Sequence, residues 1–461
     1  MTALTLPKMV RQTGALVLLI GIACIPGYGQ EVALGILIVT ACGNPAWTLR
    51  SLAAGTMVTF ISSPLVSASG DLSVLVSVLK WLLLFVACGR SLMSRVEPTE
   101  SYGRLIGYWA VITAVLLANS VFVSSLPSIS VFKSVGFSLG LLCVIRLAML
   151  TWNRNAEMLL FFAQLGIAVF ITSVPLLGSG AGYSKNGSGF NGILNHPQTL
   201  GVFVVMTGAA AFATACKAPR LSRVLIAFGL GLWSLIFFTG ARTALVAIAL
   251  GGTVYLFETA VRGINSSRLR YLPAPVIAIA ITGLILVVTA SPGIREGFAG
   301  FLEKGGQQSL VSVDNPEVAL DESSRGGQIF DALKLVAEHP LLGYGFGVDP
   351  DSEASMDANG SQLAGIPLSA PVEQGFLPLA TIAQIGIVGS LFVLAFLLSV
   401  FKLARVDSGE TSALFAAVLG VNLGEMIFYS VGGLGILMWA LLSLFAVSGT
   451  FQEQCFRAPS R

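Results

Sequence analysis

Apolar stretches long enough to cross a lipid bilayer recur along almost the whole of this 461-residue chain. A helix needs about 20 apolar residues to span a hydrocarbon layer ~30 Å thick, and helices satisfy their own backbone hydrogen bonds there. Charged residues make up 11% of the chain, against about a quarter in a typical soluble protein. The pattern therefore predicts an all-α, polytopic helical membrane protein.

The hydropathy pattern predicts about 14 spans of the length that a bilayer requires. They are expected at 13–26, 31–43, 50–66, 72–89, 105–125, 129–150, 157–175, 198–216, 221–239, 243–261, 273–290, 376–401, 411–429 and 432–449. The first two are short and fit a tilted or interfacial hairpin, so a total of about 12 is an alternative. The chain then divides into transmembrane segments 1–290, an external loop 291–375, transmembrane segments 376–450 and a tail 451–461.

Lysine and arginine gather on one side of this topology. With the N-terminus inside, eighteen of them fall in inner segments, seven in outer segments and one, Lys80, within a span. Because the short cytoplasmic loops of membrane proteins carry the excess of positive charge, we expect both termini to be cytoplasmic and the loop 291–375 to be outside.

The predicted outer loop is acidic, with thirteen Asp or Glu residues against four Lys or Arg between 291 and 376. Apolar residues recur at helical spacing from Arg325 to His339, which indicates an amphipathic helix on the membrane or bundle surface. Pro340 is expected to end this helix, and Gly343–Gly347 is interpreted as a flexible hinge. Residues 176–197, rich in Gly, Ser and Asn, are predicted to form a second surface loop.

Arg242 begins a predicted span at its outer end, beside Thr243. A guanidinium keeps its charge and can bond two phosphate oxygens at once. These properties fit a clamp for a diphosphate, with Thr243 as a further donor; an interfacial arginine bonded to lipid phosphate is the alternative. Arg325 heads the predicted amphipathic helix, where it would add to an anion site or pair with the acidic residues that precede it.

Three other charged residues are candidates because of where they lie. Lys80 is in the middle of a span, too deep for simple snorkelling, so it either faces a polar cavity or pairs with an acid such as Glu425. Glu425 lies near the outer end of its span, where a functional or a structural role fits. Glu373 precedes a span at the outer boundary and is a candidate general base for a sugar hydroxyl, with a solvated loop acid as the alternative.

Several kinds of site find no support in the sequence. The six cysteines lie singly, and none is in the large loop, so neither a disulfide framework nor a cysteine metal site is expected. His196 and His339 are the only histidines and lie in separate loops. No metal site and no cofactor are therefore predicted. Nucleic-acid binding is not expected either, because no basic face alternates with aromatic residues.

Four motifs follow one another on the predicted outer side. They are Phe190–Gln198, Thr239–Thr243, His339–Gly347 and a segment that runs from Glu373 to Gly389. Their order and common placement resemble the O-antigen ligase and Wzy-type polymerase superfamily of bacterial envelope glycosyltransferases. The motifs cover residues 190–390, and the topology is similar over the whole chain. The resemblance implies a GT-C-like fold and a metal-independent glycosyltransferase in the bacterial inner membrane, with its active site facing the periplasm.

The resemblance also implies the substrate. The donor would be an oligosaccharide linked to a polyprenyl diphosphate, whose diphosphate is the leaving group. Arg242 and Arg325 match the arginines that such enzymes place around the diphosphate, and Lys80 is assigned to the same group. Cationic groups there would stabilise the charge that develops on the leaving group. Membrane lipids and a protein that regulates chain length are the further expected partners.

One departure bears on the reaction. Ligases of this group typically carry a histidine followed by asparagine where this chain has Glu373-Gln374, and two extra residues separate that point from Gly386. The departure favours a polymerase, which transfers a growing glycan onto the next lipid-linked repeat unit, over a ligase that moves a finished glycan to another acceptor. A flippase for the same lipids is a third alternative. Such transporters usually have paired halves, and the sequence shows no repeat.

Overall fold

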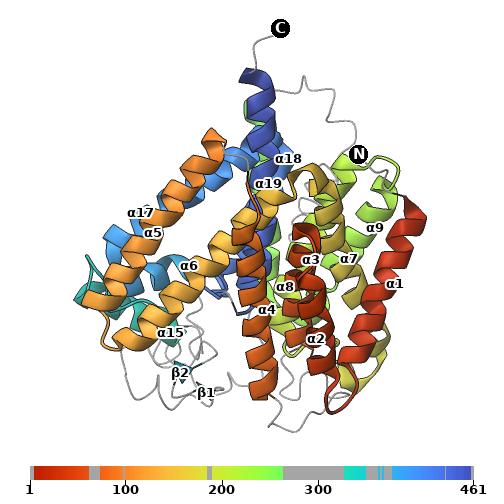
Figure 1. The fold of residues 1–461 in the computed structure, drawn as a ribbon, viewed down its shortest axis with the longest axis horizontal. Helices are drawn as coiled ribbons and strands as arrows, with labels where there is room; N and C mark the ends of the chain where they lie inside the picture. The colour runs from red at the N-terminus through yellow and green to blue at the C-terminus, as the bar shows by residue number, and fades with distance from the viewer. Residues whose placement is uncertain are drawn as a thin grey trace, which may run out of the picture.

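The computed structural model describes residues 5–61, 73–96, 99–183, 189–262, 326–348, 362–363, 366–367, 376–430 and 432–457. Within these ranges the chain forms a bundle of long apolar helices (Figure 1). Eight helical segments of the described residues are long and apolar enough to cross a membrane, and three shorter helical segments are also apolar. The protein is therefore an all-α, multi-pass membrane protein, as predicted.

The helices follow the predicted spans in order. They are α1 (Leu6–Ala23), α2 (Gly29–Ala41), α3 (Pro45–Thr59), α4 (Ser73–Met93), α5 (Glu100–Phe122), α6 (Pro127–Leu150), α7 (Asn155–Ser173), α8 (Pro197–Lys217), α9 (Ser222–Ser234), α10 (Ile236–Thr239), α11 (Arg242–Arg262), α15 (Gly326–Glu338), α17 (Leu377–Asp407), α18 (Gly409–Gly420) and α19 (Leu434–Arg457). Short 3₁₀ helices are η3 (Trp152–Arg154), η4 (Val174–Gly178), η5 (Gly180–Gly182) and η7 (Val421–Leu423), and β1 (Gln362–Leu363) pairs with β2 (Ile366–Pro367). The predicted span 273–290 lies outside the described residues.

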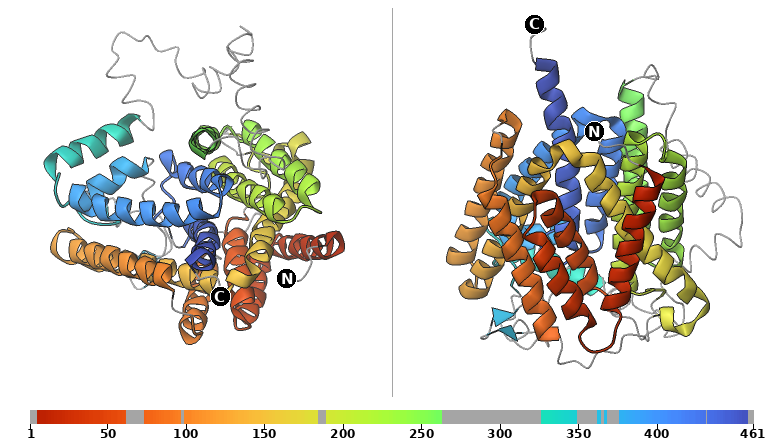
Figure 2. Two further views of the ribbon diagram at one scale, coloured as in Figure 1. Left: turned by 90° about the horizontal axis from the view of Figure 1, so that it is seen from above. Right: turned by 45° about the vertical axis from the view of Figure 1, so that its right-hand side comes forward.

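Successive long helices run in alternate directions, so their ends define two faces of the bundle (Figures 1 and 2). We call the face where α1 begins the N-terminal face; α3, α5, α7 and α9 also begin there. The opposite face, which we call the loop face, carries α15 and the β1–β2 hairpin. Seen from above, α15 lies on the rim of the bundle beside α17 (Figure 2).

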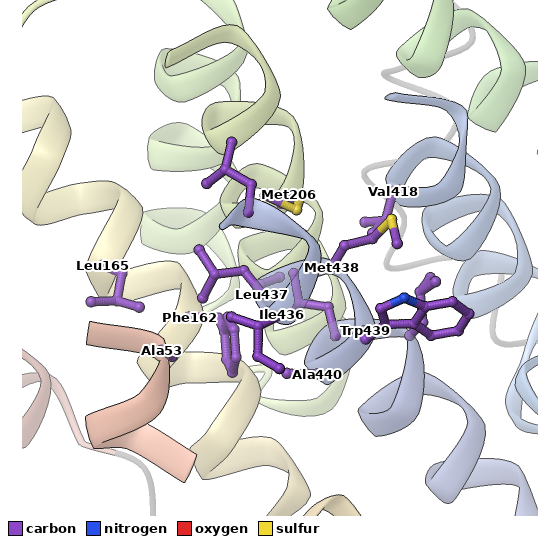
Figure 3. Close-up of a cluster of buried hydrophobic side chains, with 14 of the residues drawn as sticks. Ala53, Phe162, Leu165, Met206, Val418, Ile436, Leu437, Met438, Trp439 and Ala440 are labelled. Atoms are coloured by element: carbon purple, nitrogen blue, oxygen red, sulfur yellow. The ribbon is translucent and has the colours of Figure 1, made fainter. Parts of the chain in front are cut away.

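The centre of the bundle is formed by α7, α8 and α19. Almost every residue of α8 is buried, and Figure 3 shows the side chains that meet there from several helices. Since lipid is as apolar as these side chains, close packing holds such helices together, and small residues allow it. At Gly251 of α11, for example, a Cβ would lie 2.8 Å from the Cβ of Ala417 on α18.

The helix α17 is interrupted within its apolar length. Gly386 has φ 68° and ψ 178°, so the helical path breaks at this residue. A break leaves carbonyls without donors on one side and N–H groups without acceptors on the other. Inside a membrane such groups need partners from the protein itself.

The partners come from the stretch that follows α15, residues 339–348. Tyr344 N donates to Ala383 O, and Gly345 N donates to Gln384 O, both at 3.0 Å. Beyond the break, Ile387 N donates to Pro340 O at 2.9 Å. We call residues 339–348 the inserted segment, because its backbone completes the hydrogen bonds of both halves of α17.

Side chains of α5 and α6 bind the other edge of the inserted segment. Asn119 Nδ2 donates to Leu342 O at 2.6 Å, Ser130 Oγ lies 2.6 Å from Phe346 O, and Lys133 Nζ donates to Gly347 O. Phe346 is 2% exposed. The prediction that Gly343–Gly347 is a flexible hinge is therefore wrong, because its glycines allow close contact of backbones inside the bundle.

Two other expectations about the loops can be compared with the structure. The amphipathic helix is confirmed as α15, with Leu335 and Val336 packed toward Tyr344. The prediction of a surface loop at 176–197 is wrong for its second half, since Phe190 is fully buried and Leu194 pairs with Ile61. Small polar residues there make tight turns between buried side chains.

The hydroxyl of Ser130 offers a test of how firmly the inserted segment is bound. Besides Phe346 O, it lies 2.8 Å from Ser120 Oγ. We expect Ser130→Ala to lower the free energy of unfolding by about 1–3 kcal/mol, because it leaves a buried carbonyl short of a donor. Thermal unfolding of the purified protein in detergent measures the change.

Ser138 on the same helix provides the matched control. Its Oγ is buried and has no hydrogen-bond partner among the described residues. Ser138→Ala should leave the unfolding temperature unchanged or raise it slightly. Equal effects of the two substitutions would contradict a specific role for the Ser130 contact.

Candidate functional site

The site is built around the turn that joins α10 to α11 on the loop face. Gly240 has φ 65°, a left-handed conformation that reverses the chain between the two helices. Thr239 Oγ1 donates to Ile236 O at 2.9 Å and accepts from Ala241 N at 3.1 Å. The next helix begins at Arg242, so the arginine lies at a helix N-terminus, where the dipole also favours an anion.

The motif 190–198 packs directly on this turn. Phe190 N donates to Phe238 O at 2.9 Å. A Cβ at Gly189 would overlap Thr239 O, and one at Gly201 of α8 would overlap the Cβ of Ala241. Only glycine allows these approaches. Two of the motifs that define the resemblance are therefore packed together through residues at and next to their ends, although about 40 residues separate them in the sequence.

The other two motifs are also in contact. The inserted segment contains the motif 339–347, and it bonds α17 at residues 383–388, which lie in the motif that ends at Gly389. Both motif pairs are thus formed by backbone contact. Each pair depends on glycine at the point of closest approach, Gly189 in the first and Gly386 in the second.

One non-helical stretch connects the two pairs. The predicted span 411–429 is helical only as far as Leu423, and the chain then continues without regular structure to the start of α19. We call residues 424–433 the bridging segment; Val431 within it lies outside the described residues. A Cβ at Gly424 would overlap Thr243 Oγ1, and the Tyr429 ring lies 5.0 Å from that of Phe346.

Aromatic side chains of α6 and α19 pack against the bridging segment. Phe428 and Tyr429 pack against Phe137, with ring centroids 6.1 and 5.2 Å from it. Trp439 Nε1 of α19 donates to Phe428 O at 2.8 Å. These contacts hold irregular backbone in place within an apolar bundle, which is tolerated where protein or a polar cavity surrounds it.

Lys80 meets the far end of the bridging segment. Its Nζ would lie 3.3 Å from a Cβ at Gly432. The side chain is half-buried and lines a small cavity of about 10 Å³, close to the volume that one ordered water needs. Leu52, Thr56 and Trp81 are among its other lining residues.

An ion pair between Lys80 and Glu425 is not formed in this structure. Among the described residues, no Asp or Glu oxygen lies within 4.0 Å of Lys80 Nζ. A charged amine at this depth is costly. Of the two predicted environments, the structure places Lys80 at a small cavity beside the bridging segment rather than in an ion pair with Glu425.

The structure brings four of the predicted site residues to the same region. Arg242, Thr243 and Glu425 lie where α11 meets the bridging segment, and Lys80 lies at its other end. Arg242 and Glu425 are half-buried, and Thr243 is buried. Arg325 and Glu373, the predicted second arginine and general base, lie outside the described residues, so the structure gives no geometry for them.

Neither the bridging segment nor the break in α17 is predicted from the sequence. The signals were present as Gly432-Gly433 and Gly386, but glycine is frequent in membrane helices. A hydropathy window that averages over about 20 residues does not register one break.

The chain matches no protein-family model, and no curated protein matches it. The functional conclusion therefore depends on the motifs and on how the structure arranges them.

Proposed function

We propose that this protein is a polymerase of a bacterial surface polysaccharide or exopolysaccharide. It transfers the growing glycan from a polyprenyl-diphosphate carrier onto the next lipid-linked repeat unit. The N-terminal face lies in the cytoplasm, as the excess of Lys and Arg in the inner segments supports. The loop face then lies outside the cytoplasm, where the reaction takes place.

One observation carries the proposal. The motifs that resemble the ligase and polymerase superfamily contact each other in two pairs, and the bridging segment touches both pairs through Gly424 and Tyr429. Chance similarities along a sequence have no reason to meet in space. The arrangement supports one composite site with Arg242 at its edge.

The proposed reaction needs one bond to form and one to break. A hydroxyl oxygen of the acceptor attacks the anomeric carbon of the donor glycan, and the bond from that carbon to the diphosphate oxygen breaks. The lipid diphosphate leaves with the bonding electrons, while the hydroxyl proton passes to a general base, the role proposed for Glu373.

The cationic residues act on the leaving group. Arg242 and Lys80, with Arg325, bind the diphosphate and stabilise the negative charge that grows on it. Thr243 has a different role, because its hydroxyl packs under Gly424. We assign it to positioning the bridging segment next to Arg242.

Product analysis tests the proposal. Purified protein in lipid nanodiscs, supplied with lipid-linked repeat units alone, should produce a ladder of lengths still attached to polyprenyl diphosphate. Transfer of the glycan to a different carrier, without lengthening, would instead support a ligase. Passage of the intact lipid across a vesicle membrane with no new glycosidic bond would support a flippase. Either of these results would contradict the proposal that the protein is a polymerase.

Substitution of Lys80 separates function from structure. Lys80→Met keeps an extended side chain but removes a charge that has no acidic partner among the described residues. We expect chain growth to slow by about tenfold or more, while the unfolding temperature stays the same or rises because a charge is no longer held in the bundle. A rate equal to that of the unmodified protein, measured in the lengthening assay, would contradict the role of Lys80.

A further inference from the structure

A second charged cluster lies at the N-terminal face, on the opposite side of the bundle from the candidate site. Lys8 of α1 and Arg50 of α3 share one acidic partner, Glu157 of α7. Lys8 Nζ lies 3.2 Å from Glu157 Oε1, and Arg50 Nη2 lies 3.5 Å from Glu157 Oε2. Three helices thus bring their charged side chains to one point at the end of the bundle.

Arg50 is held firmly, yet its hydrogen bonds are incomplete. Its side chain is 10% exposed, and its guanidinium carbon lies 5.3 Å from the ring centre of Trp47 and 5.7 Å from that of Phe161. Rings at this distance stabilise a cation. The Nε atom is buried and has no hydrogen-bond partner among the described residues.

Arg154 adds a third positive charge. It ends the 3₁₀ turn η3 just before α7, is exposed, and is near enough to Arg50 for the two charges to repel. In the described part of the chain its guanidinium forms no ion pair. Among the described residues, the three cations Lys8, Arg50 and Arg154 thus gather near one carboxylate, that of Glu157, which leaves an excess of two positive charges.

Two tryptophans place this cluster at the boundary of the membrane. Trp47 and Trp152 are 49% and 44% exposed; Trp47 lies three residues before Arg50, and Trp152 lies two residues before Arg154. Tryptophan is enriched where the hydrocarbon layer meets the lipid headgroups. At that level the surrounding anions are the phosphates of phospholipids.

We propose that Lys8, Arg50 and Arg154 form a binding site for the phosphate of an anionic phospholipid headgroup. The guanidinium of Arg50 is held by its contacts with Trp47 and Phe161 and contributes a fixed positive charge, while the exposed side chain of Arg154 is accessible to a headgroup. Glu157 keeps the cations together without neutralising them. The site is independent of the proposed transfer reaction, since it lies on the other face of the bundle.

Lipid binding to the full-length protein tests the site. The detergent-purified protein is titrated with phosphatidylglycerol or with phosphatidylcholine of the same acyl chains, and bound lipid is measured by native mass spectrometry. Phosphatidylglycerol should be retained and phosphatidylcholine should not. Arg154→Ala should weaken the apparent affinity for phosphatidylglycerol about fivefold, because one cation near a membrane surface contributes about that factor.

Arg104→Ala is the matched control. Arg104 is also exposed near the N-terminal face, on α5, but it pairs with Glu100 at 3.9 Å and lies in no cationic cluster of the described residues. Its removal should leave lipid retention unchanged. Equal retention by the Arg154→Ala variant and the unmodified protein would overturn the site. Displacement of the bound lipid by inorganic phosphate at equal concentration would also overturn it, since the site would then bind the free anion.

Discussion

Replacing Arg242 by alanine is expected to abolish polymer formation while the protein remains folded in the membrane. The arginine is half-buried at the first position of α11, within the first pair of motifs and beside Thr243, which meets the bridging segment. Loss of one strong donor to a developing oxyanion typically costs 100-fold or more in rate, and we expect about that factor or greater here. Arg242→Lys should recover only part of the rate, because an ammonium does not bond two phosphate oxygens in one plane.

The lengthening assay measures this effect, with membrane yield as the check on folding. Arg223→Ala provides the control, since Arg223 is exposed in the first turn of α9 on the N-terminal face. Its removal should change neither yield nor rate. Normal amounts of polymer from the Arg242→Ala protein would remove the diphosphate clamp from the proposal, whatever the other residues do.

Gly386→Ala is expected to have the largest effect on stability. Gly386 has a positive φ, which costs a residue with a Cβ about 1–3 kcal/mol. The added Cβ would also overlap Leu341 O of the inserted segment, and overpacking of this kind costs about 1–3 kcal/mol. We expect a loss of about 2–6 kcal/mol, since backbone cannot move aside as a flexible side chain can.

Thermal unfolding in detergent and protease digestion would reveal this loss. The inserted segment should become accessible to protease, because the substitution pushes it away from α17. Gly107→Ala is the control, since a Cβ at this position of α5 would meet nothing within 4 Å. It should be neutral or slightly stabilising. An unfolding temperature for Gly386→Ala within a degree or two of the unmodified protein would contradict the close contact with Leu341.

The inserted segment links α15 to the bundle. It follows α15 directly and is bonded on one edge by α17 and on the other by α5 and α6. The helix α15 is thereby fixed over α17 at the loop face.

The spans could be predicted from the sequence because each one reflects a local property. The helices α4, α6 and α8, for example, begin and end within about four residues of the predicted limits. Proline in the first turn marks the start of α6 and of α8. The length of a span, its apolarity and the positive charge at its ends are properties of that segment alone. They can therefore be recognised in the sequence without knowing which helices pack against it.

The candidate residues were identified by the same local reasoning. Arg242 and Lys80 stand out because a charge in an apolar segment is costly wherever it lies. Glu425 was predicted to lie within a helical span near its end, but the helix ends before it, at Leu423. No local feature of the sequence shows whether a helix continues or ends at a given residue when a neighbouring segment can supply the backbone hydrogen bonds that the helix would otherwise make.

That this chain is a multi-pass helical membrane protein follows from its sequence alone, because the bilayer acts on each apolar stretch separately. The charged residues that lie in unusual places can be identified in the same way. The burial of the glycine-rich stretch after α15, and the meeting of four distant motifs in two pairs across the bridging segment, become apparent only in the folded structure. These features depend on close backbone contacts and on hydrogen bonds from side chains to the backbone, one of which joins Asn119 to Leu342, 223 residues away. Partners so far apart leave little local pattern in the sequence beyond the glycines that permit the close contacts.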